Sequence, residues 1–231
     1  MQKILITAAL CLASAALHAR PASLLVYRVW EQGVEPYVSR ILVTEDYLRL
    51  DEGAESDGYT LFDRQQEILY NVSPQDRSVL VMNPTGLAPD DNAGLILQEE
   101  VVEDKQAPMV AGQRPRQVRL LANGEVCTEL VVIGGVMDAA LEGLSELKLV
   151  LARIQGSTLD ALPLDARTPC QLASDLYAPD RSLQFGLPLQ ERSPGRSQSL
   201  VDFTDDFDAD DALFEVPDAF DRRPMFAPGA I

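Results

Sequence analysis

Short apolar runs alternate with turn residues along the first third of the chain, and a new run starts about every ten residues, as in antiparallel meanders. Runs rich in β-branched and aromatic residues between Gly, Pro, Asn and Asp are typical of strands. The rhythm predicts a sandwich, a barrel or a strongly curved sheet. The expected strands are Leu24–Glu31, Val38–Thr44, Tyr47–Glu52, Tyr59–Asp63, Glu67–Val72 and Ser78–Met82.

The first expected strand carries apolar side chains on both faces. Leu24, Val26 and Trp30 share one face, and Tyr27 and Val29 share the other. A sheet of this kind is covered on both sides, or one of its faces lines an apolar hollow.

One later segment has the periodicity of an amphipathic helix. Between Val136 and Ile154 apolar residues recur at steps of three and four, acids come early and bases late, and Gly156 is a suitable stop. A second, short helix is expected from Thr168 to Tyr177. The apolar stripe of the main helix is Met137, Ala140, Leu144, Leu147, Leu151 and Ile154.

Further strands are expected before and after this helix. Asn123-Gly124 favours the tight turn of a hairpin, and Ser193-Pro194-Gly195 indicates a second hairpin. An acidic and aromatic loop is expected from Asp202 to Glu215, and residues 221–231 are expected to fray. The expected strands are Leu95–Val102, Arg116–Ala122, Glu125–Ile133, Ser182–Arg192 and Arg196–Phe203.

The chain opens like a secretory leader, residues 1–19. Lys3 precedes an apolar stretch, Ile4–Leu17, that is too short to span a bilayer. We place the cleavage after Ala19, with Ala16 as the second choice. The mature protein is then expected to be periplasmic or secreted, without a transmembrane segment and without the only histidine, which lies in the leader.

Cys127 and Cys170 remain in an oxidising compartment, where an even pair usually forms a disulfide. A disulfide between them would close a loop of 44 residues, counted inclusively. By the chain-entropy estimate, closing such a loop adds roughly 4 kcal/mol of stability. A redox role is the alternative, but the spacing is not a CxxC motif. We expect a structural staple that holds the amphipathic helix against the sheet.

The charge and the residue inventory exclude several classes of function. The net charge is −17 at pH 7, and removal of the leader, whose one charged residue is Lys3, leaves 18 basic and 36 acidic residues. Such a surface repels nucleic acids and anionic lipid head groups. Without histidine, Ser-His-Asp and Cys-His mechanisms and histidine zinc sites are excluded as well. We expect no enzyme, no cofactor, no metal centre and no nucleic-acid partner.

Two weaker chemistries stay open. Asp206, Asp208 and Asp210 have the spacing of a calcium loop, but an aspartate and a proline stand where an EF-hand needs glycine and glutamate. A looser calcium site therefore remains an alternative to a solvated acidic loop. A carboxylate-based glycosidase is the other alternative, although Trp30 is the only tryptophan that could stack on a sugar.

The order of elements resembles the LolA/LppX-like superfamily of exported half-barrels, and most closely its uncharacterised secreted members. A curved antiparallel sheet, a helix inserted late and two closing strands follow a leader, and the cysteine pair belongs to the same pattern. The likeness covers most of residues 22–220. The segments that carry it are Tyr47–Asp51, Leu61–Asp63, Ile68–Tyr70, Val79–Asn83 and Ala212–Pro217.

In that superfamily the sheet wraps around helices, and the hollow can take lipid or the acyl chain of a lipoprotein. The resemblance implies an α+β fold with one half-barrel domain over residues 20–220, in which a strongly curved antiparallel sheet holds the main helix on its concave face. It also implies a non-enzymatic binder of an apolar ligand. The alternative is an envelope protein that docks on a basic partner through residues 202–226. The candidates for the pocket lining are Tyr27, Trp30, Tyr47, Phe62 and Tyr70.

Overall fold

The computed structural model describes residues 19–53, 58–84, 94–103, 105–156 and 167–225. The expected leader lies outside these residues, except for Ala19, where the first strand begins. The described residues form one large sheet with one main helix, so the expected α+β class is confirmed.

The described residues contain twelve strands, which form a single sheet in the order β12-β6-β5-β4-β3-β2-β1-β11-β10-β9-β8-β7. All neighbouring strands are antiparallel except β12 and β6. The sheet is open, with β12 and β7 at its edges, and it is neither closed into a barrel nor strongly curled. The strands are β1 (Ala19–Glu31), β2 (Tyr37–Val43), β3 (Tyr47–Asp51), β4 (Tyr59–Asp63), β5 (Ile68–Ser73), β6 (Ser78–Met82), β7 (Leu97–Glu103), β8 (Arg116–Ala122), β9 (Glu125–Ile133), β10 (Leu187–Ser193), β11 (Arg196–Asp210) and β12 (Asp221–Pro224).

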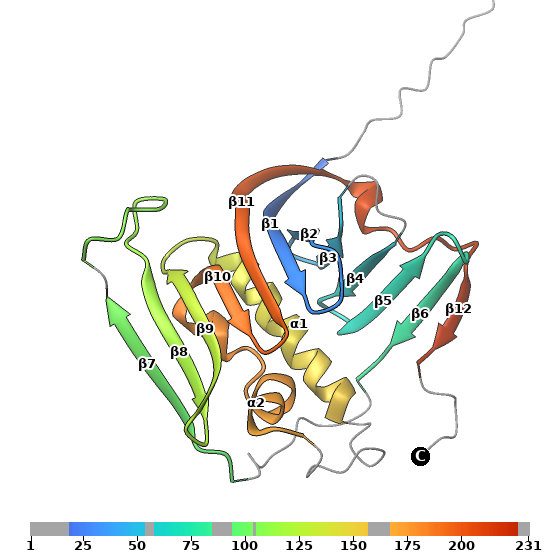
Figure 1. Ribbon diagram of the computed structural model, residues 1–231. Coiled ribbons are helices and arrows are strands. Elements are labelled where there is room, and N and C mark those ends of the chain that lie inside the picture. Colours follow the sequence, from blue (N-terminus) through green and yellow to red (C-terminus); the bar gives the residue numbers. More distant parts are fainter. Residues whose placement is uncertain (1–18, 54–57, 85–93, 104, 157–166, 226–231) are drawn as a thin grey trace, which may run out of the picture.

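The two halves of the chain meet at the pair β1 and β11, which lie side by side in the middle of the sheet (Figure 1). On one side of this pair β2–β6 continue the expected meander that begins with β1, and on the other side β7–β10 form the second half. Asn123 and Gly124 have φ angles of 52° and 82°, so the tight turn between β8 and β9 is confirmed.

The main helix, α1 (Asp138–Gly156), packs on one face of the sheet, which we call the helix face. Its apolar stripe is buried against β1–β5. A Cβ atom at Gly143 would lie 2.8 Å from Cγ1 of Val43, so only glycine allows α1 to approach β2 this closely. The guanidinium of Arg64, just after β4, donates to both carboxylate oxygens of Glu146 at 2.6 and 2.9 Å. The sheet residues of this core include Leu25, Val29, Ile41, Val43, Leu48, Phe62 and Leu69.

Three short helical segments lie beside α1 and against β8 and β9: α2 (Pro169–Leu172), η3 (Ala173–Tyr177) and η4 (Arg181–Phe185). The side chain of Thr168 accepts from the backbone N–H of Gln171 and begins α2. The expected short helix is therefore confirmed as α2 followed by η3. The expected strand from Ser182 is wrong at its start, because η4 comes first and Gly186, at φ +115°, separates it from β10.

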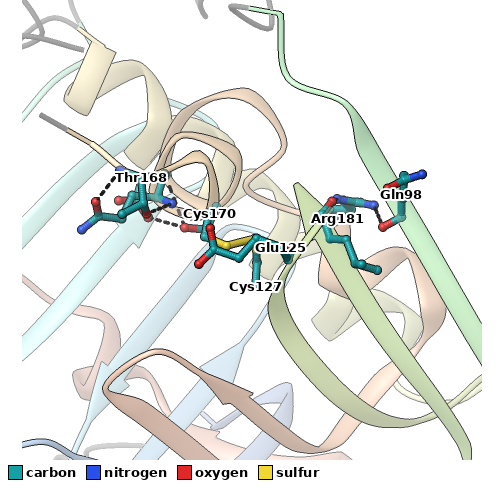
Figure 2. Close-up of a disulfide and its surroundings, with 10 residues drawn as sticks. Gln98, Glu125, Cys127, Thr168, Cys170 and Arg181 are labelled. Atoms are coloured by element: carbon teal, nitrogen blue, oxygen red, sulfur yellow. Dashed lines mark hydrogen bonds between the residues drawn. A yellow bond between two sulfur atoms is a disulfide. The ribbon is translucent and has the colours of Figure 1, made fainter. Parts of the chain in front are cut away.

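Cys127 in β9 and Cys170 in α2 form the expected disulfide (Figure 2). It ties α2 to β9, and not α1 to the sheet as expected, because α1 is held by its own apolar face. Close by, the buried guanidinium of Arg181 donates to the carbonyls of Gln98 in β7 and Leu121 in β8. Both links fix the layer of short helices on the second half of the sheet.

The C-terminal segment crosses the face opposite α1, which we call the outer face. The expected acidic loop after Asp202 is wrong in part, because β11 runs on to Asp210 and a 3₁₀ turn, η5 (Asp211–Phe214), follows. The chain then adds β12 to the edge of β6, so residues 221–224 of the expected tail are ordered in the sheet. The remaining tail, from residue 226, lies outside the described residues.

Candidate functional site

The outer face has two halves of different character. The covered half is the outer face of β2–β5 with the start of β1, and the segment from residue 207 to 216 packs over it. The open half is the outer face of β7–β10 with the end of β1 and the start of β11, where many side chains are exposed. The two halves are continuous through β1 and β11.

In the covered half, apolar and aromatic side chains make a second core. Phe214 is buried and stacks on Tyr47, with 6.1 Å between the ring centroids. The guanidinium of Arg20 lies over both rings and pairs with Asp211 at 2.5 Å. The sheet residues beneath are Ala22, Leu42 and Leu61, and Leu213 and Val216 complete the cover.

Asp51 is the centre of a buried ion-pair network at the edge of this cover. Its side chain is fully buried, and it accepts from Arg40 at 2.7 Å, from Arg49 at 2.6 Å and from the backbone N–H of Gly53 at 2.9 Å. Burial alone would raise the pKa of Asp51, but the hydrogen bonds from the two arginines and Gly53 outweigh it, so the pKa lies below its usual range.

The same network holds the C-terminal segment. Arg49 donates to the carbonyl of Leu213 at 2.6 Å, and its guanidinium lies 3.8 Å from the centroid of the Tyr59 ring. The Tyr59 hydroxyl donates to the carbonyl of Glu215 at 2.6 Å. These groups are satisfied by the protein itself, so the network has a structural role.

The open half contains a hollow of about 610 Å³, which we call the polar trough. Directly opposed residues of neighbouring strands point to the same face, and the register places Trp30, Ser197, Arg192, Glu129, Arg119 and Glu100 in one row across β1, β11, β10, β9, β8 and β7. Short serine side chains at the start of β11, which is in the middle of this row of strands, leave the hollow between the larger side chains on either side. Trp30 stands at its end and is 40% exposed.

Three carboxylates and two guanidinium groups line the trough, and Glu191 is the acid outside the row. Arg119 pairs with Glu129 at 3.3 Å and with Glu100 at 3.6 Å. Arg192 forms no ion pair with any described residue. Four uncharged polar side chains that also line the trough make no side-chain hydrogen bond within the described part of the chain. Their polar groups are therefore available to a ligand. The four residues are Gln117, Gln190, Ser197 and Ser199.

A second hollow of about 480 Å³ adjoins the trough, and we call it the apolar groove. It lies between the β7–β8 loop and β9–β11, at two breaks in the strand register. One break falls at Leu189 in β10 and the other at Val201 in β11, which is 65% exposed. The lining is mainly apolar: Ala107, Pro108, Val110, Pro115, Val131, Leu189, Leu200, Val201 and Phe203, with Gln190 and Ser199.

The structure does not bring the five expected lining residues together. Tyr27 and Phe62 are buried on the helix face, in the core that fills the space between α1 and the sheet. Tyr47 and Tyr70 lie on the outer face in the covered half. Trp30 alone lines a hollow of the open half. Alternation shows which residues of one strand share a face, but only the register relates the faces of different strands. For this reason the sequence could not show that the five residues lie on different faces.

Tyr27 shows how fully the expected hollow is filled. Its hydroxyl donates to the carbonyl of Pro188 at 3.0 Å, across the sheet from β1 to β10. Burial, with the nearby carboxylate of Glu191, raises the pKa of Tyr27 well above its usual range. The side chain is therefore a satisfied core residue and not a lining group.

The sequence reading missed the serines and the register breaks that shape the two hollows. Arg196–Phe203 was expected to be a strand, so alternation alone places Ser197 and Ser199 on one face. The register break at Val201 has no comparable sequence signal, because a bulge is defined by the pairing of two strands.

The acidic segment forms no metal cage in the described part of the chain. Asp206, Asp208 and Asp210 lie in β11, where alternate residues are roughly 6.6 Å apart. Carboxylates spread along an extended strand do not converge on one ion as those of a loop do.

A scan against protein-family models and a search of curated proteins find no match for this chain. Among the described residues there is no helix long and apolar enough to cross a membrane. The disulfide is consistent with an extracytoplasmic protein.

Proposed function

We propose that the protein is a non-enzymatic binding protein, periplasmic or secreted, that takes an apolar ligand such as a lipid or the acyl chain of a lipoprotein. The observation that carries the proposal is the apolar groove at the register breaks of β10 and β11. Its volume falls in the range of about 300–1,000 Å³ that is typical of ligand sites. In this proposal the ligand lies at the register breaks, where Leu189, Leu200 and Phe203 border the core around α1.

The driving force would be the removal of apolar surface from water. Each methylene that a chain buries contributes about 0.8 kcal/mol, and an exposed Val201 would be covered at the same time. The resemblance to LolA/LppX-like half-barrels supports the same class of ligand. We include in the proposal that the open sheet and α1 are a flattened form of that half-barrel.

The test is calorimetry with laurate below its micellar concentration, on the mature protein and on Val201→Asp. A carboxylate in the groove must lose its hydration or repel the chain, so we expect Val201→Asp to weaken laurate binding by more than about tenfold. Val34→Asp is the matched control, because Val34 is 54% exposed in the β1–β2 turn and lines neither hollow. Equal affinity for the two variants would contradict the groove, and lipid extracted from natively purified protein would support it.

The exposed carboxylates of β11 favour a second candidate, an envelope interaction module. Asp205, Asp206 and Asp208 are exposed on the part of the strand that leads to η5. A basic partner surface would be attracted to them. Deletion of this segment is an unsuitable test, because it also removes the cover of the covered half. Crosslinking in the envelope with the three aspartates changed to asparagine is the cleaner experiment, and unchanged crosslinks would count against this candidate.

A further inference from the structure

The apolar groove and the polar trough adjoin each other and share lining residues. Val131, Gln190 and Ser199 line both hollows. A chain that lies in the groove therefore ends beside the trough, and whatever is attached to the chain meets the side chains there. The question is which headgroup those side chains fit.

The trough offers an aromatic face and uncharged hydrogen-bonding groups. Trp30 presents an indole ring at one end, and such rings provide a large apolar surface with a polar edge. Gln117, Gln190, Ser197 and Ser199 provide amide and hydroxyl groups that both donate and accept. A headgroup with several hydroxyls and an apolar C–H face matches both features.

Electrostatics argues against a charged headgroup. The carboxylates of Glu100 and Glu129 share the row with the guanidinium groups of Arg119 and Arg192, and the third acid of the lining, Glu191, accepts a hydrogen bond from Gln198 at 2.8 Å. The whole chain carries −17, so an anion approaches against a repulsive field. A cation finds no local excess of negative charge in this row, since Arg119 already occupies both carboxylates.

We propose that the ligand is an amphiphile with a neutral, sugar-like headgroup, whose hydroxyls bind in the polar trough against Trp30. The placement of its tail rests on the function proposed above. The placement of its head rests on the trough alone, so the two can fail separately.

The protein carries its own reporter, because Trp30 is its only tryptophan. We would titrate the mature protein with dodecyl maltoside and with laurate, both below their micellar concentrations, and follow the tryptophan emission together with calorimetry. The proposal predicts that the maltoside shifts the emission to the blue and binds about tenfold more tightly than laurate. Laurate, whose tail reaches only the groove, leaves the emission nearly unchanged.

Two substitutions separate the head from the tail. Trp30→Ala should remove the advantage of the maltoside in calorimetry and leave laurate within about twofold. Ser197→Phe fills the floor of the trough and keeps the reporter, so it should abolish the emission shift. Val201→Asp should weaken both ligands.

Other results of these titrations would overturn the headgroup, the apolar groove or both. Equal affinity for the two ligands, with no change in emission, overturns the headgroup and leaves the apolar groove. Maltoside binding that depends on Trp30 but not on Val201 supports the headgroup and overturns the groove. Absence of binding for both ligands overturns both proposals.

Discussion

The two halves of the outer face belong to one sheet but differ in what covers them. Over β2–β5, Phe214 and its neighbours seal an apolar surface, and a network around Asp51 satisfies the charges at its edge. Over β8–β10 and the start of β11, serine and glutamine side chains face solvent, and the hollows remain open. The difference shows that the C-terminal segment is a part of the fold, while the open half keeps polar side chains at its surface.

The covered half explains the acidic and aromatic segment that stood out in the sequence. Its aromatic residue Phe214 is a core residue, and Asp211 is paired with Arg20. Part of the segment therefore makes its contacts within the molecule. Asp205, Asp206 and Asp208 of β11 are exposed.

The largest expected effect comes from the disulfide, which supports the open half from behind. Replacement of Cys127 and Cys170 by serine should lower the free energy of unfolding by about 4 kcal/mol. Hydrogen exchange should then show lost protection in α2, η3 and β9, while β2–β4 under η5 keep theirs. Equal loss of protection in both halves would show that they are not separate in stability.

Phe214→Ala should remove the cover of the other half at a cost of about 3 kcal/mol, because a buried aromatic side chain is lost and a cavity remains. Val102→Ala is the matched control in the open half, since Val102 is exposed in the edge strand β7, and it should change stability by less than about 0.5 kcal/mol. Urea denaturation measures both. Similar costs for the two variants would remove the distinction between the halves.

The third prediction concerns the dependence of stability on pH. Because the folded pKa of Asp51 is depressed, its ion pairs contribute stability above the unfolded pKa of about 3.9, and this contribution is lost as the pH falls through the lower, folded value. Asp51→Asn should be less stable by about 3 kcal/mol at pH 7, as expected when one partner of a buried network is removed, and its deficit should shrink in acid.

Glu129→Gln in the open half is the control for that experiment, because it removes an exposed ion pair of Arg119. Its cost should stay within about 1 kcal/mol at neutral pH. Melting curves of the two variants and the wild type between about pH 2 and 7, where carboxylates titrate, measure both stability losses as a function of pH. A deficit of Asp51→Asn that persists in acid would contradict the proposed role of the network.

Much of the fold could be predicted from local patterns. The strands Tyr59–Asp63, Ser78–Met82, Arg116–Ala122 and Glu125–Ile133 begin and end where expected, because turn residues bound them on both sides. The apolar stripe of the main helix packs against the core as expected, with Leu151 only partly buried. In contrast, β12 (Asp221–Pro224) has no apolar residue that faces a core, and only its pairing with β6 makes it a strand.

The candidate site was less predictable, because it depends on the register. Alternation placed Trp30 on the same face of its strand as Leu24 and Val26. It could not show which face this is, or that β10 and β8 bring Arg192 and Arg119 into the same row. The tyrosines attracted attention as large side chains, yet Tyr27 and Tyr47 serve the two cores. Short residues such as Ser197 shape the hollow by leaving space, which no motif announces.

The most direct test of the account is a methyl NMR titration of the mature protein with dodecyl maltoside. If the open half is the binding surface, the methyl resonances of Val131, Leu189 and Val201 shift, while those of Leu42 and Leu61 in the covered half do not. Shifts confined to the covered half or to the core around α1, with Val131 and Val201 unchanged, would contradict the account.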